Sequence, residues 1–118
     1  MTKAIGSRAD YRWFLTIPTR WMDNDVFAHV NNVVYYSWFD TTVARFLMDA
    51  VGINPLASAI VGFVVETQCR YFAPTAFPDV ITGGLRVAHI GNTSVRYELG
   101  MFRNDEDRAA AEDRKSVV

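Results

Sequence analysis

A single long helical pattern, over residues 33–50, restricts the possible folds of this chain more than any other feature of the sequence. Asn31 or Asn32 can cap its N-terminus, and Gly52 stands where a left-handed residue commonly ends a helix. Further bulky apolar groups lie off the main apolar stripe, so the helix would be covered on more than one side. We therefore expect a central helix. Its main stripe follows helical spacing and consists of Phe39, Val43, Phe46, Leu47 and Ala50.

The other strong patterns in the chain are those of β-strands. Apolar and polar side chains alternate with a period of two, which predicts strands, and Gly91-Asn92 is a typical hairpin turn. Gly83-Gly84, inside a strand, predicts a bulge or a close approach of another segment. The order of one strand, a long helix and a run of antiparallel strands predicts an α+β fold. The predicted strands cover residues 11–17, 63–72, 80–90 and 94–103.

Weaker patterns mark the loops and both ends of the chain. We interpret residues 20–30 as an ordered loop, residues 51–60 as a connection containing Asn54-Pro55, and residues 1–10 as a loose N-terminus. Residues 107–118 show neither strand alternation nor aromatic side chains, so we expect at best a short fifth strand there. Removing the last eight residues is then predicted to leave the fold and the melting temperature nearly unchanged.

Length and composition exclude several classes of protein. A chain of 118 residues suits one domain, 1–118, and 50% apolar residues exclude a disordered chain. A net charge of −1 argues against binding of nucleic acid. No apolar run is long enough to span a membrane, and the first residues lack the apolar core of a signal peptide. The single cysteine permits no intrachain disulfide, which fits a cytoplasmic protein.

The residues that could carry chemistry gather in the segment just before the helix. Two carboxylates and an imidazole, on Asp23, Asp25 and His29, are suitable ligands for a divalent ion. Further ligands are hard to find, because His89 lies in a distant predicted strand, and we expect no metal. No Gly-x-Ser-x-Gly elbow of a serine hydrolase is present. Cys69 alternates with the residues of a strand and is interpreted as a small core residue rather than a nucleophile.

Asp25 is the best candidate for a catalytic group because it lies a few residues before a helix N-terminus. The free amides and the dipole at that end of a helix favour negative charge, and they can bind a carbonyl oxygen as it becomes an oxyanion. A carboxylate beside such amides can attack an activated acyl group or act as base on a water molecule. The alternative is that Asp25 caps the loop and helix, and Asp23 is more simply a loop-bracing residue. Asn31 and Asn32 are first of all helix caps.

Two segments resemble a known family. The residues from Asp23 to Tyr35 are similar to the signature of the hot-dog-fold acyl-CoA thioesterases, and more narrowly to the 4-hydroxybenzoyl-CoA thioesterase-like group. The segment from Glu66 to Pro74 also agrees, and the likeness extends over residues 11–104. The resemblance implies an antiparallel sheet wrapped around a long central helix. It also implies hydrolysis of an acyl-CoA to a free acid and coenzyme A without a cofactor.

The resemblance assigns roles to individual residues. The family's catalytic carboxylate falls on Asp25, and its oxyanion amide falls on Asn32, with Val33 as the neighbouring alternative. His29, Asn31 and Asp23 are then supporting residues. The family also implies self-association as a homodimer or homotetramer, with the active site near the subunit interface.

Two departures from the family affect this interpretation. The family usually has glycine where this chain has Ala28; if that position needs a positive φ, alanine costs about 1 kcal/mol or shifts the loop. Many members also continue through a long fifth strand where this chain has its charged, alanine-rich tail, which we interpret as atypical and possibly truncated. Two rival functions are therefore kept. One is a non-catalytic hot-dog module that binds acyl groups or only assembles, and the other is an acyl-CoA dehydratase of the same fold.

Overall fold

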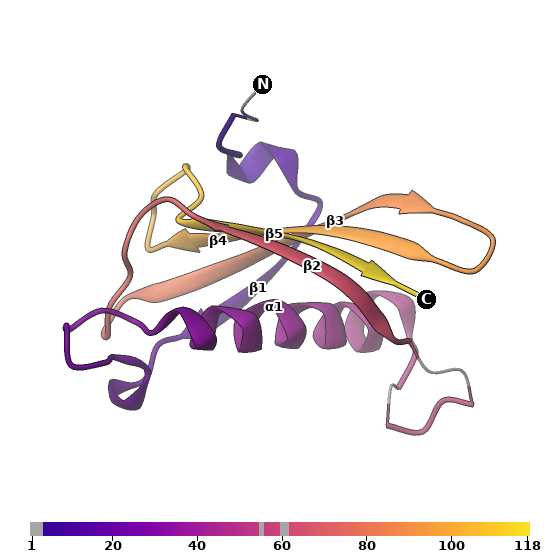
Figure 1. Cartoon of the computed structure of the whole chain (residues 1–118), viewed down its shortest axis with the longest axis horizontal. Helices are drawn as coiled ribbons and strands as arrows, with labels where there is room; N and C mark the ends of the chain where they lie inside the picture. The colour runs from indigo at the N-terminus through magenta and orange to yellow at the C-terminus, as the bar shows by residue number, and fades with distance from the viewer. Residues whose placement is uncertain (1–3, 55, 60–61) are drawn as a thin grey trace.

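The computed structural model describes residues 4–54, 56–59 and 62–118 and shows one antiparallel sheet with a long helix against one face (Figure 1). The order of strands in the sheet is β1-β3-β4-β5-β2. This is the predicted hot-dog arrangement, and the α+β fold class is confirmed. Of the predicted connection 51–60, Pro55 and residue 60 lie outside the described residues. The elements are β1 (Trp13–Pro18), α1 (Asn32–Phe46), β2 (Val64–Tyr71), β3 (Val80–Ile90), β4 (Val95–Arg103) and β5 (Ala111–Val117).

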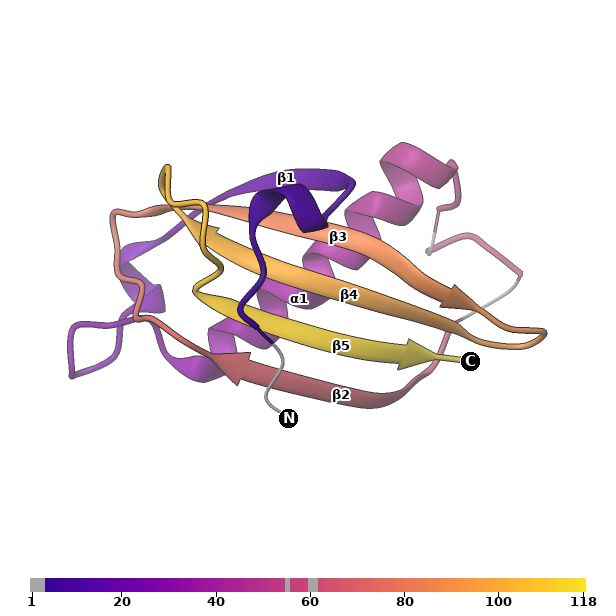
Figure 2. The same ribbon diagram turned by 90° about the horizontal axis from the view of Figure 1, so that it is seen from above.

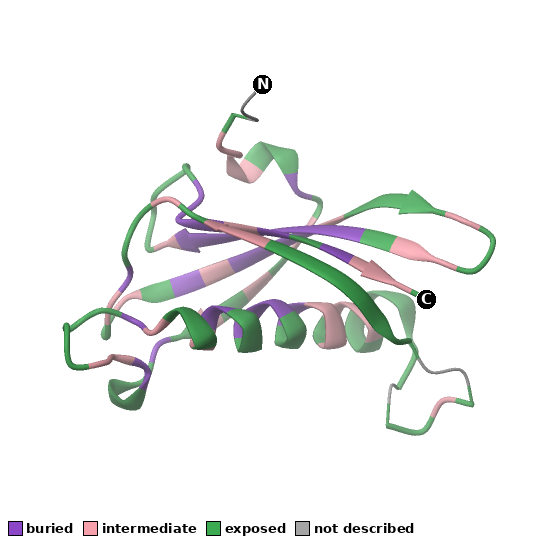
Figure 3. Cartoon of the chain, in the orientation of Figure 1, coloured by how far each residue is buried: buried purple, intermediate pink, exposed green. Residues whose placement is uncertain are grey.

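Helix α1 and the turn η3 that continues it together begin and end close to where the sequence predicts. The Asn31 side chain accepts a hydrogen bond from the Val33 amide as N-cap, and Gly52 ends the helix with φ 83°. The last turn, η3 (Leu47–Val51), is a wider π-helical turn. The buried face differs from the predicted stripe, since Tyr35 and Trp38 are buried while Ala50 is exposed. Figure 3 shows this buried face turned toward the sheet.

Gly83 and Gly84 serve two different close approaches, one on each face of the sheet. A Cβ at Gly83 would lie 2.6 Å from the Thr42 hydroxyl oxygen, so the missing side chain lets α1 approach β3. On the other face Gly84 pairs with Gly100 in β4, and the Tyr11 ring covers both glycines. The predicted close approach is confirmed. The irregularity in the β3–β4 register lies elsewhere, between Val87 and His89.

The expectation for the C-terminal tail is wrong. Residues 111–117 form strand β5, which is hydrogen-bonded to β4 along one edge and to β2 along the other (Figure 2). Without β5 the edge strand β2 would have no partner among the described strands. For removal of the last eight residues the structure predicts the opposite of what the sequence pattern predicted, because these residues contain the whole of an interior strand.

Charged side chains on β5 explain why its pattern was not recognised. Asp113 and Lys115 point to the helix side of the sheet and are both 3% exposed. The Lys115 ammonium lies 3.2 Å from an Asp113 oxygen and 3.1 Å from an oxygen of Asp40 on α1. Thr67 of β2 donates a hydrogen bond to the other Asp113 oxygen, at 2.6 Å. These partners compensate the cost of burying two charges at positions where a sheet usually places apolar groups.

The N-terminal segment is also better anchored than predicted. Gly6 donates a backbone hydrogen bond to Glu112 of β5, and Arg8 donates to the backbone oxygens of Asn104 and Glu106. The segment crosses the face of the sheet opposite α1 (Figure 2). There Tyr11 packs with Phe102 in a second, smaller apolar cluster. Residues 4–10 therefore differ from the predicted loose end.

Candidate active site

The loop before α1 is held by Asp23. The Asp23 side chain is 1% exposed, and its oxygens accept hydrogen bonds from the Arg20 backbone amide, at 2.8 Å, and from the Arg20 guanidinium. Its carbonyl oxygen accepts from the Asn31 amide at 3.1 Å. Asp23 thus joins the start of the loop to the residue that caps the helix, and its carboxylate oxygens face Arg20 rather than a pocket.

Asp25 lies in a tight turn that closes on His29. The Asp25 amide donates to the His29 carbonyl oxygen at 2.9 Å, and the Ala28 amide donates to the Asp25 carbonyl oxygen at 3.0 Å. One carboxylate oxygen of Asp25 accepts from the Phe27 amide at 2.8 Å. Within the part of the chain that is described, no partner is found for the second oxygen. The half-buried Asp25 carboxylate is thus oriented by one bond and keeps one oxygen available.

Ala28 has a φ of 64°, so the position where the family usually has glycine does need a left-handed backbone. Ala28→Gly is expected to raise the free energy of unfolding by about 1 kcal/mol, because only the alanine side chain is strained in this conformation. Urea unfolding measures the change. Ala44→Gly, inside α1, is the control and is expected to lower stability by about 1 kcal/mol. An equal decrease in the free energy of unfolding for the two variants would contradict the assignment of strain to Ala28.

The first two amides of α1 differ in their availability. The Val33 amide donates to the Asn31 side-chain oxygen at 2.9 Å. The Asn32 amide has no hydrogen-bond acceptor among residues 4–54, 56–59 and 62–118. Asn32 was one of the two predicted oxyanion donors and Val33 the other. The helix cap therefore occupies the Val33 amide and not that of Asn32.

A shallow pocket of about 340 Å³ opens beside this end of the helix. The structure brings His29 and Asn32 together in its wall, whereas Asp25, Asn31 and Val33 are not among the lining residues. The end of β2 supplies Tyr71, which sequence reasoning did not identify as a residue of the site. The strand pattern placed Tyr71 and Cys69 on the same face of a strand, but it did not show that this face meets the start of α1. The pocket is lined by His29, Val30, Asn32, Tyr35, Tyr71, Phe72, Ala73 and Pro74.

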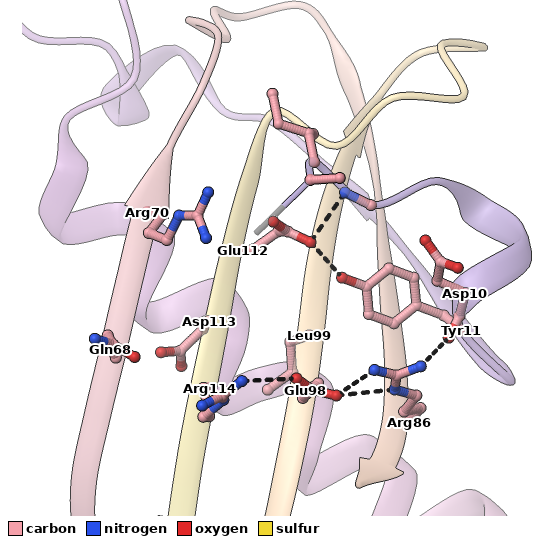
Figure 4. A pocket seen from close by; sticks show the side chains of 13 residues that line it. Asp10, Tyr11, Gln68, Arg70, Arg86, Glu98, Leu99, Glu112, Asp113 and Arg114 are labelled. Atoms are coloured by element: carbon pink, nitrogen blue, oxygen red, sulfur yellow. Dashed lines mark hydrogen bonds and ion pairs between the residues drawn. The ribbon is translucent and has the colours of Figure 1, made fainter. Parts of the chain in front are cut away.

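A larger hollow of about 510 Å³ lies on the opposite face of the sheet, under the N-terminal segment (Figure 4). Several of its charged side chains form hydrogen bonds within the hollow. Glu98 accepts from both Arg86 and Arg114, and Glu112 accepts from the Tyr11 hydroxyl at 3.2 Å. It contains none of the residues of the loop before α1. We therefore place the candidate active site at the smaller pocket, where a free helix amide and the signature loop meet.

Two further properties concern the described residues as a whole. In that part of the chain no three His, Cys, Asp or Glu side chains are grouped closely enough to hold a metal ion. None of the helices found there has the length and apolar character needed to cross a membrane.

Comparisons with known proteins place the chain in a family. The family model described as the Thioesterase superfamily matches residues 27–110, more than half of the chain. A crystal structure of a protein from Pseudomonas aeruginosa strain PAO1 is 45% identical, covers 98% of this chain and 80% of its own, and superimposes with a TM-score of 0.93. A comparison with curated proteins gives no match.

More distant solved structures share the fold. A thioesterase from Thermus thermophilus, complexed with coenzyme A and Zn, is 24% identical over 89% of this chain and 76% of its own, with a TM-score of 0.74. A DHNA-CoA thioesterase from Staphylococcus aureus is 14% identical over 89% of this chain and 71% of its own, with a TM-score of 0.81. Fold and site together define a hot-dog protein with a shallow pocket at a helix N-terminus. The chain belongs to the thioesterase superfamily and is a thioester hydrolase.

Proposed function

We propose that this protein hydrolyses an acyl-CoA by means of the Asp25 carboxylate and the backbone amide of Asn32. The observation that carries the proposal is the difference between the first two amides of α1. The Val33 amide is occupied by the Asn31 cap, whereas the Asn32 amide has no acceptor among the described residues and lines the pocket. An amide at the positive end of a helix dipole is suited to bind a carbonyl oxygen as it gains charge.

The reaction can follow either of two routes. In the first, the Asp25 carboxylate attacks the thioester carbon, the coenzyme A thiolate leaves, and water hydrolyses the resulting anhydride. In the second, Asp25 takes a proton from a water molecule that attacks the same carbon, the C–S bond breaks, and coenzyme A leaves as the thiolate. In both routes the carbonyl oxygen becomes an oxyanion and accepts a hydrogen bond from Asn32. The second, unbonded oxygen of Asp25 suits either task.

The remaining residues of the loop support this geometry. Asp23 joins Arg20 to Asn31, and Asn31 orients the first turn of α1. His29 closes the turn that contains Asp25 through its carbonyl oxygen, and this exposed residue also lines the pocket. The proposal needs no cofactor and includes a cytoplasmic location, where acyl-CoA is available.

A panel of acyl-CoA substrates of different chain length and aromaticity, monitored for free thiol, tests the proposal. Release of coenzyme A from at least one of them, at a rate that depends on Asp25, is expected. Acyl-CoA binding without thiol release would favour the non-catalytic module. Conversion of the acyl group with no released thiol would favour the dehydratase.

We further propose that the protein assembles as a homodimer or homotetramer. Most of the edge strand β2 is exposed (Figure 3). Its exposed apolar side chains lie at its two ends, Val64 and Val65 at the start and Tyr71 at the end; Val65 is 54% exposed, and Phe63, just before β2, is 70% exposed. An apolar strand at the open edge of a sheet favours pairing with another chain. Because Tyr71 of β2 lines the pocket, such an interface would adjoin the active site.

Light scattering at micromolar concentration is expected to give a mass of at least twice 13.3 kDa. Val65→Lys places a charge on the edge strand and should shift the protein toward the monomer. Val87→Lys, on β3, is the matched control and should leave the mass unchanged. A stable, folded monomer of the unaltered protein would contradict the assembly proposal.

A further inference from the structure

One peptide group in the first turn of α1 is held at both ends by side chains. The Val33 N–H donates to the Asn31 side-chain oxygen at 2.9 Å. The carbonyl oxygen of the same peptide group, that of Asn32, accepts from the Tyr71 hydroxyl at 3.2 Å. Asn31 belongs to the loop, and Tyr71 belongs to strand β2. Tyr71 is 39 residues away from Asn32 in the sequence. The orientation of this peptide group therefore depends on the sheet as well as on the helix cap.

The Asn32 amide belongs to the adjacent peptide group. Its direction relative to the held group is determined by the two backbone dihedrals of Asn32, φ and ψ. We propose that Tyr71 is a positioning residue, which aims the Asn32 amide at the oxyanion by holding the Asn32 carbonyl group. This inference rests on the function proposed above for Asn32. Sequence reasoning did not identify it, because the contact joins the end of β2 to the start of α1.

The surroundings of Tyr71 favour a role for its hydroxyl group beyond ring packing. The Tyr71 ring contacts the Tyr35 ring edge-to-face, with centroids 5.2 Å apart, and a phenylalanine could make the same contact. The hydroxyl lies next to the Cys69 thiol and the Tyr36 hydroxyl, and burial together with these neighbours raises the pKa of Tyr71. Tyr71 thus stays protonated at neutral pH and remains able to donate to Asn32.

Tyr71→Phe tests the inference because it removes the hydroxyl and keeps the ring. The variant is expected to lower kcat about tenfold, since the oxyanion amide is no longer held in place. KM should change less than about twofold, because the aromatic ring that lines the pocket is kept. Tyr97→Phe is the matched control. Tyr97 is a buried tyrosine that packs on Phe46, and its variant should leave both constants unchanged.

A second readout does not depend on catalysis. In ¹⁵N–¹H spectra, Tyr71→Phe is expected to shift the amide signals of Asn32 and Val33 and to speed their hydrogen exchange, whereas Tyr97→Phe leaves them in place. Unchanged signals, or a rise in KM with kcat unchanged, would overturn the positioning role. If the unaltered protein cleaves no thioester but the two signals still shift, the positioning contact stands and the proposed hydrolysis fails.

Discussion

Asp25→Asn is expected to lower kcat for the best acyl-CoA substrate by about a hundredfold or more. The carboxamide has nearly the same size, but it is a poor nucleophile and cannot take a proton from water. It can still accept the hydrogen bond from the Phe27 amide, so the loop should keep its conformation. KM should change less than about twofold, because the lost charge acts on the reacting carbonyl group rather than on coenzyme A. Steady-state assays of thiol release measure both constants.

Asp23→Asn is the matched control, since the two aspartates are separated by a single residue. Asp23 is buried and its oxygens accept from the Arg20 amide and guanidinium, so the substitution weakens a charged contact inside the loop. A loss of about 1–3 kcal/mol in the free energy of unfolding is expected, with a smaller effect on kcat than that of Asp25→Asn. Full activity of Asp25→Asn would remove Asp25 from the mechanism.

Deletion of residues 111–118 is expected to abolish cooperative folding. Strand β5 is paired with β4 and β2, and its loss would separate β2 from the rest of the sheet. The deletion would also leave Asp40 and Thr67 without their partners on β5. Circular dichroism during thermal unfolding should show no sharp transition, because a domain of this size is only marginally stable.

Arg114→Gln is the control for this deletion, since it changes an exposed side chain of the same strand. Arg114 is 44% exposed and pairs with Glu98 at 3.5 Å. Loss of such a surface pair should cost no more than about 1 kcal/mol. A deletion variant that melts like the intact protein would show that β5 is dispensable, as the sequence pattern alone predicted.

The central elements of the fold could be predicted from the sequence because their signals are local. The spacing of apolar residues, the Asn31 cap and Gly52 define α1, and alternation defines β3 almost to the residue. The family signature placed Asp25 before that helix and Asn32 at its start. The need for a left-handed backbone at Ala28 was also predictable from the residue that usually stands there.

Strand β5 could not be predicted because its stability is not local. Its inward positions carry Asp113 and Lys115, which have the character of solvent-exposed residues in the sequence. They are buried because Asp40, from α1, and Thr67, from β2, provide partners for their charges. Charged side chains can be buried in a strand only when distant elements supply an opposite charge and a hydrogen bond, as α1 and β2 do here.

The site divides in the same way between sequence and tertiary structure. The sequence by itself determined the loop, the helix start and two adjacent amides, Asn32 and Val33, either of which could bind an oxyanion. Only the tertiary structure shows how the hydrogen bonding of the two amides differs, because that difference depends on where two side chains lie. The Asn31 side-chain oxygen accepts a hydrogen bond from the Val33 amide. The Tyr71 hydroxyl, at the end of β2, donates a hydrogen bond to the Asn32 carbonyl oxygen. The spacing of residues in a sequence contains no information on such a contact, since it forms only when β2 packs beside the first turn of α1.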